Sequence, residues 1–208
     1  MTRQTLAPLK REAMAANPLV EFDRWFELAV KHADYAMPEA ACLSTVDDEG
    51  YPEGRIVLLK ARDLEGFVFY TNLRSAKGRA LAVRPRAALT FYWESLMRQV
   101  RIQGDVERVS DEVSDAYFRS RARESQIGAR ASPQSTVLGS RDELLASVAE
   151  VKERYRGADV PRPAHWGGLR ILPHEIEFWQ GMPNRLHDRF VYRRGGLNEE
   201  WTLERLAP

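Results

Sequence analysis

The sequence has little of what marks secreted, metal-binding or membrane proteins. Cys42 is its one cysteine, so no disulfide can form within the chain and a reducing compartment is expected. The four histidines are scattered, and a single thiol cannot complete a thiolate metal cluster. No apolar run is long enough to cross a membrane, and the first residues lack the apolar core of a signal peptide. These features predict a cytoplasmic protein without a metal site or a membrane partner.

The sequence also has no excess of positive or negative charge. The chain has 31 basic and 30 acidic residues, so no overall field attracts nucleic acid. A length of 208 residues with 44% hydrophobic and 29% charged residues suits one soluble domain with a buried core. We expect residues 1–16, which are polar and lack a clear period, to be a mobile arm, and residues 17–208 to be a single domain.

Signatures of familiar enzymes are absent as well. The chain contains no Gly-rich dinucleotide or nucleotide loop, no nucleophile elbow of the form G-x-S-x-G and no H-E-x-x-H zinc motif. These absences remove the most easily recognised activities, but they exclude no class of enzyme.

Short apolar segments separated by turn residues predict a mainly β protein with flanking helices (α+β). A helix is expected from Asn17 to about His32, because Asn17 caps it, Pro18 follows, and apolar residues recur at helical spacing. Five strand-like segments follow over about seventy residues. They are residues 41–46, 55–61, 67–71, 87–93 and 99–109. Such closely spaced strands favour an antiparallel barrel or sandwich over a parallel sheet.

Helices and strands also alternate in the second half. A helix is predicted near residues 111–119, and the polar, basic stretch 119–135 is interpreted as a long functional or disordered loop. Ser140 and Glu143 form a capping box that opens a further helix. The remaining predicted strands are residues 169–172, 176–180, 186–192 and 201–206.

Polar groups gather at the ends of the predicted hairpin of residues 55–61 and 67–71. Arg55 and Lys60 lie on its first strand, Tyr70 and Thr71 on its second, and Lys77 follows just inside a short helix that Ser75 can cap. Cations, hydroxyls and the free N–H groups of a helix start suit a phosphate-bearing ligand. The same pattern is equally typical of a core hairpin with solvated ends.

Two further stretches concentrate polarity. Tyr117, Arg121 and Ser125 are four residues apart, so a helix continuing that far would align them to hold a phosphate. A solvated basic face is the simpler alternative, and the lack of aromatic partners argues against nucleic acid.

The other stretch joins Arg185, His187 and Arg189. Alternation along a strand would put these three on one face, with Leu186 pointing the other way. Clustered cationic and titratable groups repel one another unless an anion lies over them, although a lone histidine is more often structural.

The segment I-E-F-W-Q-G-M-P-N-R-L-H-D-R, residues 176–189, resembles the C-terminal signature of the pyridoxamine (pyridoxine) 5′-phosphate oxidase family. Other motifs resemble the same family in the same order. They are R-I-V-L-L-K from Arg55, F-Y-T-N-L from Phe69, R-Q-V from Arg98, S-Q-I-G-A from Ser125, W-G-G from Trp166 and the terminal E-R-L-A-P. The resemblance covers roughly residues 17–208.

This resemblance implies the antiparallel split β-barrel of FMN-binding proteins, assembled as a homodimer with FMN at the interface. The implied FMN-binding residues are Arg55, Ile56, Val57, Leu58, Leu59, Lys60, Tyr70, Thr71, Lys77, Gln99, Gln134, Ser135, Trp179 and Arg189. The implied substrate-binding residues are Lys60, Tyr117, Arg121, Ser125, Arg185, Leu186 and His187. Arg185 and His187 are the implied catalytic pair, in which Arg185 positions the substrate and His187 orients it or handles a proton.

The implied reaction is FMN-dependent oxidation of pyridoxine and pyridoxamine 5′-phosphates to pyridoxal 5′-phosphate, with O2 as acceptor and H2O2 released. Two alternatives remain open. One is a flavin oxidase of the phenazine-biosynthesis type, which acts on a tricyclic substrate without phosphate. The other is a non-catalytic FMN- or haem-binding split barrel.

Overall fold

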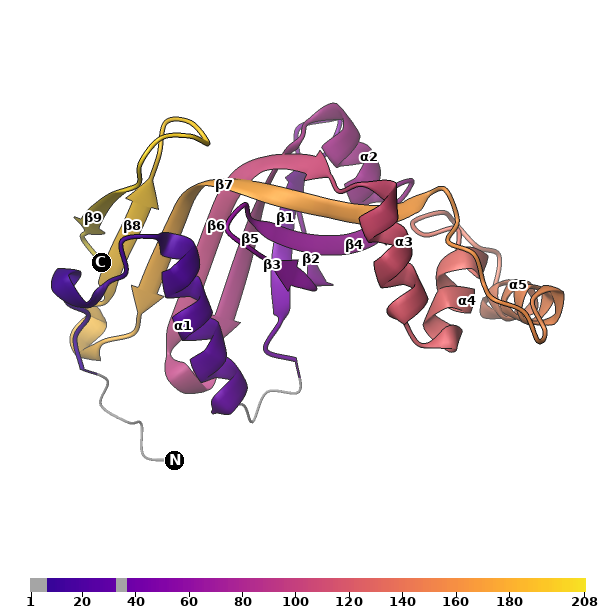
Figure 1. The fold of residues 1–208 in the computed structure, drawn as a ribbon, viewed down its shortest axis with the longest axis horizontal. Helices are drawn as coiled ribbons and strands as arrows, with labels where there is room; N and C mark the ends of the chain where they lie inside the picture. Colours follow the sequence, from indigo (N-terminus) through magenta and orange to yellow (C-terminus); the bar gives the residue numbers. More distant parts are fainter. Residues whose placement is uncertain (1–6, 33–36) are drawn as a thin grey trace.

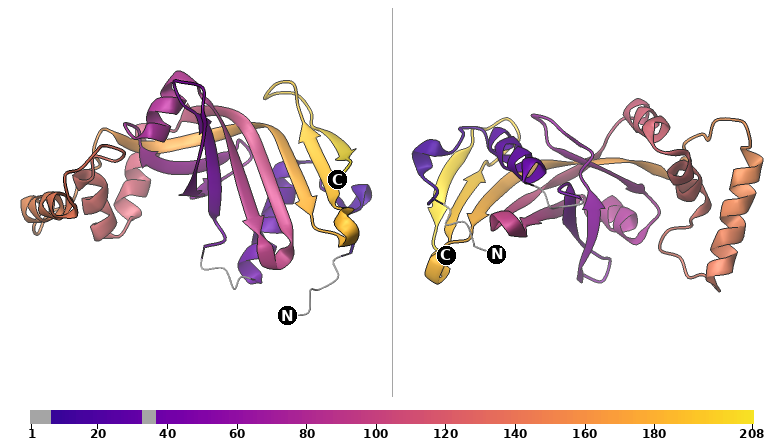
Figure 2. Two further views of the ribbon diagram at one scale, coloured as in Figure 1. Left: turned by 180° about the vertical axis from the view of Figure 1, so that it is seen from behind. Right: turned by 90° about the horizontal axis from the view of Figure 1, so that it is seen from below.

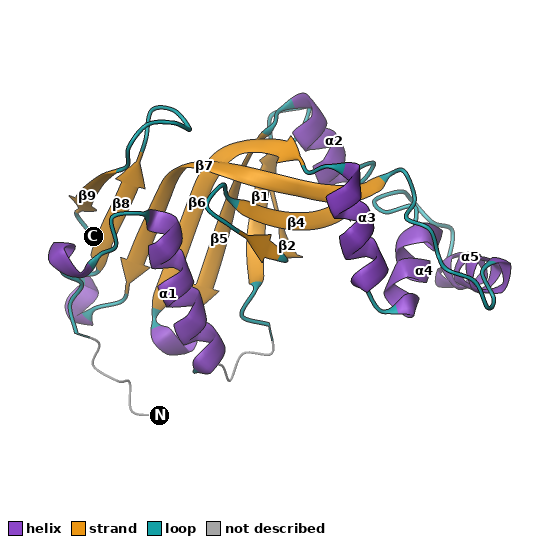
Figure 3. Cartoon of the chain, in the orientation of Figure 1, coloured by secondary structure: helices purple, strands orange, loops and turns teal. Residues whose placement is uncertain are grey.

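One antiparallel sheet forms the centre of the computed structural model, which describes residues 7–32 and 37–208 (Figures 1 and 3). Its strands within these ranges are β1 (Ala40–Val46), β2 (Pro52–Leu58), β3 (Ala61–Arg62), β4 (Phe67–Asn72), β5 (Arg86–Trp93), β6 (Arg98–Arg108), β7 (Trp166–Gln180), β8 (Asp188–Arg193) and β9 (Thr202–Leu206). The α-helices are α1 (Pro18–Lys31), α2 (Ala76–Val83), α3 (Asp111–Ser120), α4 (Arg123–Ala131) and α5 (Arg141–Arg154). Short 3-10 turns occur at η1 (Arg11–Ala13), η2 (Glu94–Leu96) and η3 (Pro183–Arg185).

The sheet curls because two consecutive strands lie at its opposite edges. The strand order is β2-β1-β5-β6-β7-β4-β3, and only Leu59 and Lys60 separate β2 from β3. The two edges therefore meet at this short connection, as a barrel requires. The barrel is split along β7, whose first half pairs with β4 and whose second half pairs with β8. Strands β8 and β9 consequently extend away from the barrel (Figure 1).

A bulge marks the point where β7 changes partners. The register of β6 against β7 shifts between Gln103 and Gly104, where Gly104 lies opposite Pro173. Pro173 has no N–H to give to the ladder, and a Cβ on Gly104 would lie 2.0 Å from the carbonyl oxygen of Leu172. A glycine is therefore required for the two strands to approach this closely.

Alternation along the strands separates a core face from an outer face. Leu43, Leu89, Ile102, Ile176 and Tyr192 lie opposite one another across five strands and are buried. Helix α1 covers this face, since its Phe22 ring packs edge-on to rings of the barrel core. The outer face includes the rows that contain Gln99 and Arg101.

The predicted helix caps are confirmed. Asn17 caps α1 by accepting from the N–H of Leu19 at 2.9 Å, and Ser75 caps α2. Ser140 accepts from the N–H of Glu143, as the capping box predicts. Helix α2 ends at Val83, just before Arg84 and Pro85.

Three predicted segments differ in the structure. The predicted strand 55–61 is wrong as one strand: β2 ends at Leu58 and pairs with β1, while β3 pairs with β4. The predicted loop 119–135 contains α4, whose Ile127 and Ala131 are buried one turn apart. The predicted strands 169–172 and 176–180 are one strand, β7, because the bulge bends it without ending it.

Residues 7–16 of the predicted arm contact the core face of the extension. The N–H of Leu9 donates to Asp188 at 2.9 Å, and the Tyr192 hydroxyl donates to the carbonyl of Ala15 at 2.6 Å. Residues 1–6 lie outside the described part of the chain. The mobility of the arm and the single-domain division stay predictions. In the described ranges no helix is long and apolar enough to span a membrane, and no group of three or more His, Cys, Asp or Glu residues could hold a metal ion.

Candidate functional site

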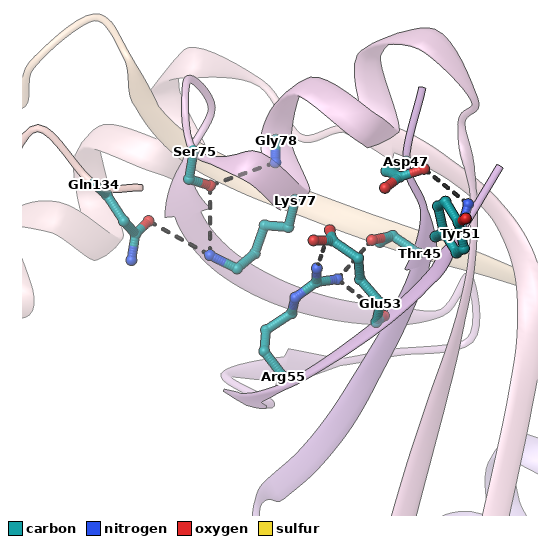
Figure 4. Close-up of polar contacts among 9 residues, drawn as sticks. All are labelled: Thr45, Asp47, Tyr51, Glu53, Arg55, Ser75, Lys77, Gly78 and Gln134. Carbon is teal, nitrogen blue, oxygen red and sulfur yellow. Dashed lines mark hydrogen bonds and ion pairs between the residues drawn. The ribbon is translucent and has the colours of Figure 1, made fainter. Parts of the chain in front are cut away.

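Two cations from different elements converge beside the start of α2 (Figure 4). Arg55 on β2 donates to the hydroxyl of Thr45 at 2.5 Å and pairs with the carboxylate of Glu53 at 2.6 Å. Lys77, in the first turn of α2, lies 3.4 Å from the Oγ of Ser75 and 3.5 Å from the Oε1 of Gln134. The contacts of Lys77 are long for charge-assisted hydrogen bonds, which leaves its ammonium weakly satisfied.

The electrostatics of this pair favour an added anion. Burial lowers the pKa of Lys77, the nearby Arg55 cation lowers it further, and Glu53 acts in the opposite direction. One carboxylate therefore does not neutralise the two cations. The free N–H groups of the α2 start add neutral donors beside them, whereas the Ser75 hydroxyl already donates to the carbonyl of Asn72. This donor set suits a phosphate dianion.

A cavity of about 300 Å³ adjoins the pair through Gln134, which lines it together with Tyr70, Thr71, Arg121 and Trp166. Burial lowers the pKa of Arg121, opposed by Tyr117, and its Nη1 is buried without a hydrogen-bond partner in the described structure. A buried guanidinium nitrogen without an acceptor is costly. The cavity therefore offers a second position for an anionic group.

Flat rings line the same cavity. Tyr70 stacks on Tyr117 with centroids 3.9 Å apart and lies nearly parallel to Trp166 at 5.3 Å. The guanidinium carbon of Arg121 is 4.9 Å from the Trp166 ring centroid. Stacking of a planar cation on an aromatic ring orients its donors. The rings thus hold Arg121 in place at the cavity.

The predicted helical alignment of Tyr117, Arg121 and Ser125 is wrong. Helix α3 ends at Ser120, Arg121 is extended, and α4 begins at Arg123. Tyr117 and Arg121 nevertheless belong to the same cluster, because both side chains contact the Trp166 ring. Ser125 is exposed in the first turn of α4.

A second group of predicted residues forms a row across the outer face. Gln99 on β6 lies directly opposite Trp179 on β7, which lies opposite Arg189 on β8. The His187 ring contacts Trp179, with centroids 4.6 Å apart. Strand register therefore brings Gln99 beside two residues of the distant segment 176–189.

The prediction that Arg185, His187 and Arg189 share one strand face is wrong. Strand β8 begins only at Asp188, and Arg185 lies in the preceding turn η3 with a left-handed backbone. The cause is the turn itself, in which Pro183 starts η3 and Asn184 is also left-handed. The Nδ1 of His187 accepts the N–H of Met182 at 3.1 Å, which fixes the imidazole on the turn. Leu186 and Arg185 are exposed, Leu186 to 68%.

One chain does not bring all the predicted residues together. Strand β7 is the long orange strand that crosses the molecule in Figure 2. Trp166 and Trp179 are near its opposite ends, roughly 40 Å apart at about 3.3 Å per residue if the strand were straight. Arg121 is at the first end and His187 at the second. Lys60 is at the barrel seam, where it pairs with Glu39 at 3.4 Å. Ser135 is exposed beside Gln134 and has a left-handed backbone.

The remaining predicted cofactor residues belong to the seam. Ile56, Val57 and Leu58 continue β2 after Arg55, and Leu59 is buried beside Lys60. Ile56 is 66% exposed, which is unusual for its type and marks an uncovered surface.

Sequence reasoning assigned no role to several side chains of these groups. Thr45 and Glu53 hold Arg55, and Glu177 holds Arg189 at 2.7 Å. Glu177 sits within the I-E-F-W signature, which was the available signal. Its partners come from other strands, so only the sheet register identifies them.

Two family models match the chain. The one described as pyridoxamine 5′-phosphate oxidase matches residues 30–155, and the one described as the pyridoxine 5′-phosphate oxidase C-terminal dimerisation region matches residues 166–208. The chain belongs to the pyridoxamine 5′-phosphate oxidase family. The family inferred from the motifs is confirmed.

Similar proteins agree with this membership. A Burkholderia lata protein named pyridoxine/pyridoxamine 5′-phosphate oxidase is 51% identical over 203 residues, covering 97% of this chain and 94% of the relative. The crystal structure of PhzG from Burkholderia lata 383, in complex with tetrahydrophenazine-1-carboxylic acid, gives a TM-score of 0.89 at 29% identity, covering 99% of this chain and 100% of that one. A pyridoxamine 5′-phosphate oxidase-related, FMN-binding protein from Nostoc punctiforme gives 0.72 at 18% identity, covering 94% and 99%. The predicted split-barrel fold is confirmed.

Proposed function

We propose that this chain binds FMN and oxidises pyridoxine and pyridoxamine 5′-phosphates to pyridoxal 5′-phosphate, with O2 as acceptor and H2O2 as second product. The observation that carries the proposal is the presence of two separate anion positions. One lies between Arg55 and Lys77, and the other at the unpartnered Nη1 of Arg121. A phosphorylated cofactor and a phosphorylated substrate require two such positions.

The residues at the first position fit the FMN phosphate. Arg55 and Lys77 supply charge, while the free N–H groups at the start of α2 supply neutral donors. The row of Gln99, Trp179 and Arg189 combines a flat apolar ring with amide and guanidinium donors, which suits a flavin ring. When bound, FMN supplies hydride acceptance and subsequent reaction with O2.

The substrate residues have distinct roles in the proposal. Arg121, Tyr117, Lys60 and Ser125 bind the substrate phosphate, with Arg121 supplying an otherwise unpaired guanidinium nitrogen. The exposed Arg185 positions the substrate and stabilises negative charge on its ring oxygen. His187, held on the turn by Met182, orients the substrate and handles a proton at Nε2.

A homodimer completes the site in this proposal. Arg121 and His187 lie near opposite ends of β7, so a second copy is the simplest source of the missing half. The outer sheet face carries Ile56 and Tyr92, 66% and 53% exposed, in the same rows as Glu177 and Trp179. The family description of residues 166–208 as a dimerisation region supports this arrangement.

The close structural likeness to PhzG makes a phenazine-type oxidation the second candidate. Identity favours the first candidate, because the chain is 51% identical to the Burkholderia lata oxidase and 29% identical to PhzG from that organism. The second anion position also favours a phosphorylated substrate over one without phosphate. The third candidate, a non-catalytic carrier, leaves that position without a ligand.

Anaerobic reduction tests the proposal. The purified protein is loaded with FMN and mixed with pyridoxine 5′-phosphate without oxygen, then with unphosphorylated pyridoxine as the matched control. We expect bleaching of the flavin by the phosphate ester, recovery of colour in air, and formation of pyridoxal 5′-phosphate and H2O2. A flavin that stays oxidised with both B6 phosphates would refute the proposed reaction, and a failure to bind FMN would refute the cofactor assignment.

A further inference from the structure

The outer face holds a buried carboxylate between two arginines, one row from Trp179. Glu177 on β7 lies directly opposite Arg101 on β6, and its side chain is 4% exposed. Its Oε2 accepts from Nη1 of Arg101 at 2.9 Å, and its Oε1 accepts from Nε of Arg189 at 2.7 Å. Each carboxylate oxygen thus has its own guanidinium partner.

Burial of the Glu177 carboxylate depends on its hydrogen bonds to the two arginines. A buried carboxylate loses its hydration, and charge-assisted hydrogen bonds to both oxygens must compensate for that loss. Two arginines around one carboxylate leave one positive charge in excess on this face. Arg189 shows the coupling most directly, because its hydrogen bond to Glu177 raises its pKa.

The same contacts fix the orientation of Arg189. Its Nε is bound to Glu177, and its Nη1 donates to the carbonyl of Ala207 at 2.9 Å. No described residue accepts a hydrogen bond from its Nη2. A guanidinium is planar, so two fixed nitrogens determine where the third one points. Arg189 lies opposite Trp179 in the sheet, so its guanidinium is held in a fixed orientation on the face that carries the indole ring.

The geometry points to Glu177 as the positioning residue of the flavin site. It holds Arg189 and Arg101 by one hydrogen bond each, one row from Trp179, and its negative charge limits the positive charge that the flavin experiences. The inference rests on the proposed function, because it takes the row of Gln99, Trp179 and Arg189 as the flavin-facing surface. Glu177 itself touches no ligand and acts through the two arginines.

The chain provides a matched control two residues away on the same face. Glu175 accepts from Nε of Arg193 at 2.7 Å and from Gln103 at 3.5 Å, with its side chain 25% exposed. It lies one row further from Trp179 than Glu177 does. Glu175→Gln therefore repeats the chemical change without touching Arg189.

FMN affinity and the reduction potential of bound FMN test the inference in the full-length protein. For Glu177→Gln we expect the Kd for FMN to rise about tenfold, since Arg189 loses a charge-assisted partner. We also expect the potential to become more positive, because removing a negative charge favours the electron-rich reduced flavin. Glu177→Asp keeps the charge but is one methylene too short for both contacts, so its affinity falls while its potential stays near that of the parent.

The experiment distinguishes a failure of the inference from a failure of the proposed function. A Kd and a potential for Glu177→Gln equal to those of Glu175→Gln would overturn the inference while leaving the proposed function intact. A parent protein that binds no FMN would overturn the proposed function instead. If Glu177→Gln does not fold, Arg101→Gln serves, because it frees one carboxylate oxygen. A severalfold rise in its Kd for FMN supports the inference, and an unchanged Kd overturns it.

Discussion

Lys77 gives the sharpest prediction, because its two expected effects have opposite signs. Lys77→Met removes the ammonium beside Arg55 and keeps a flexible side chain of similar length. We expect the variant to bind FMN more weakly, since one charge-assisted contact to the phosphate is lost. In the absence of FMN we expect it to be at least as stable as the parent, since the two cations repel each other there.

The sign of the second effect follows from the lowered pKa of Lys77. The unfolded chain holds the Lys77 proton more tightly than the folded chain does, so charging this lysine opposes folding. Below the folded-state pKa both states are protonated and the full penalty is present. The penalty fades as pH rises through the folded-state pKa, which lies below 10.5. The Met variant therefore gains most at pH values below the folded-state pKa.

The size of the first effect follows from a typical charged hydrogen bond. A loss of about 2 kcal/mol corresponds to a roughly 30-fold higher Kd for FMN. At an FMN concentration of about 100 times the parent Kd, ligand binding stabilises the parent by about 2.7 kcal/mol. The same concentration stabilises the variant by about 0.9 kcal/mol.

Urea unfolding with and without FMN measures both effects in one series. Arg79→Met is the matched control, because Arg79 is an exposed cation on the same helix and donates to the carbonyl of Arg74. The control is expected to keep the parent's gain in stability on adding FMN. An unchanged gain for Lys77→Met, or a loss of apo-protein stability as large as the loss in the holoprotein, would refute the reasoning.

Three further changes probe other parts of the molecule. Arg121→Met is expected to raise KM for pyridoxine 5′-phosphate at least tenfold without lowering stability, because its Nη1 has no protein partner; an unchanged KM contradicts this. Gly104→Ala is expected to cost about 1–3 kcal/mol in urea unfolding, because its Cβ would collide with Leu172, and an unaltered midpoint would show that the bulge adapts. Tyr192→Phe removes the hydrogen bond to Ala15 and is expected to cost about 1 kcal/mol and speed proteolysis of residues 7–16, whereas parent-like proteolysis argues against this anchoring.

Local chemistry explains what the sequence predicted well. The caps at Asn17, Ser75 and Ser140 depend on residues within three positions, and all three were predicted correctly. Residues 127 and 131 are too few apolar positions among polar neighbours to reveal α4. The strand 55–61 was misjudged because β-propensity shows which residues are extended and does not show which strand they pair with.

In the candidate site too, the sequence predicted individual residues better than the pairing between strands. Motif resemblance identified Arg55, Lys77, Trp179 and Arg189 without their partners, because motifs record residue types in one segment. Glu177 binds two arginines that are 76 and 12 residues away. Strand register creates those contacts, so they become visible only once the sheet is known. Contacts with Trp166 and Trp179 likewise place Arg121 and His187 near different ends of β7.

That separation leads to a last prediction about shared sites. If Arg121 of one copy works with Arg185 of the other, Arg121→Met and Arg185→Met dimers each carry two defective sites. Mixing the two after reversible unfolding gives about half heterodimers, in which one site has both changes and the other has neither. Activity below KM should then recover to about one quarter of the parent value. A mixture no more active than its components would place both arginines in the same copy's site, and the long strand β7 would have to bend far more than it does.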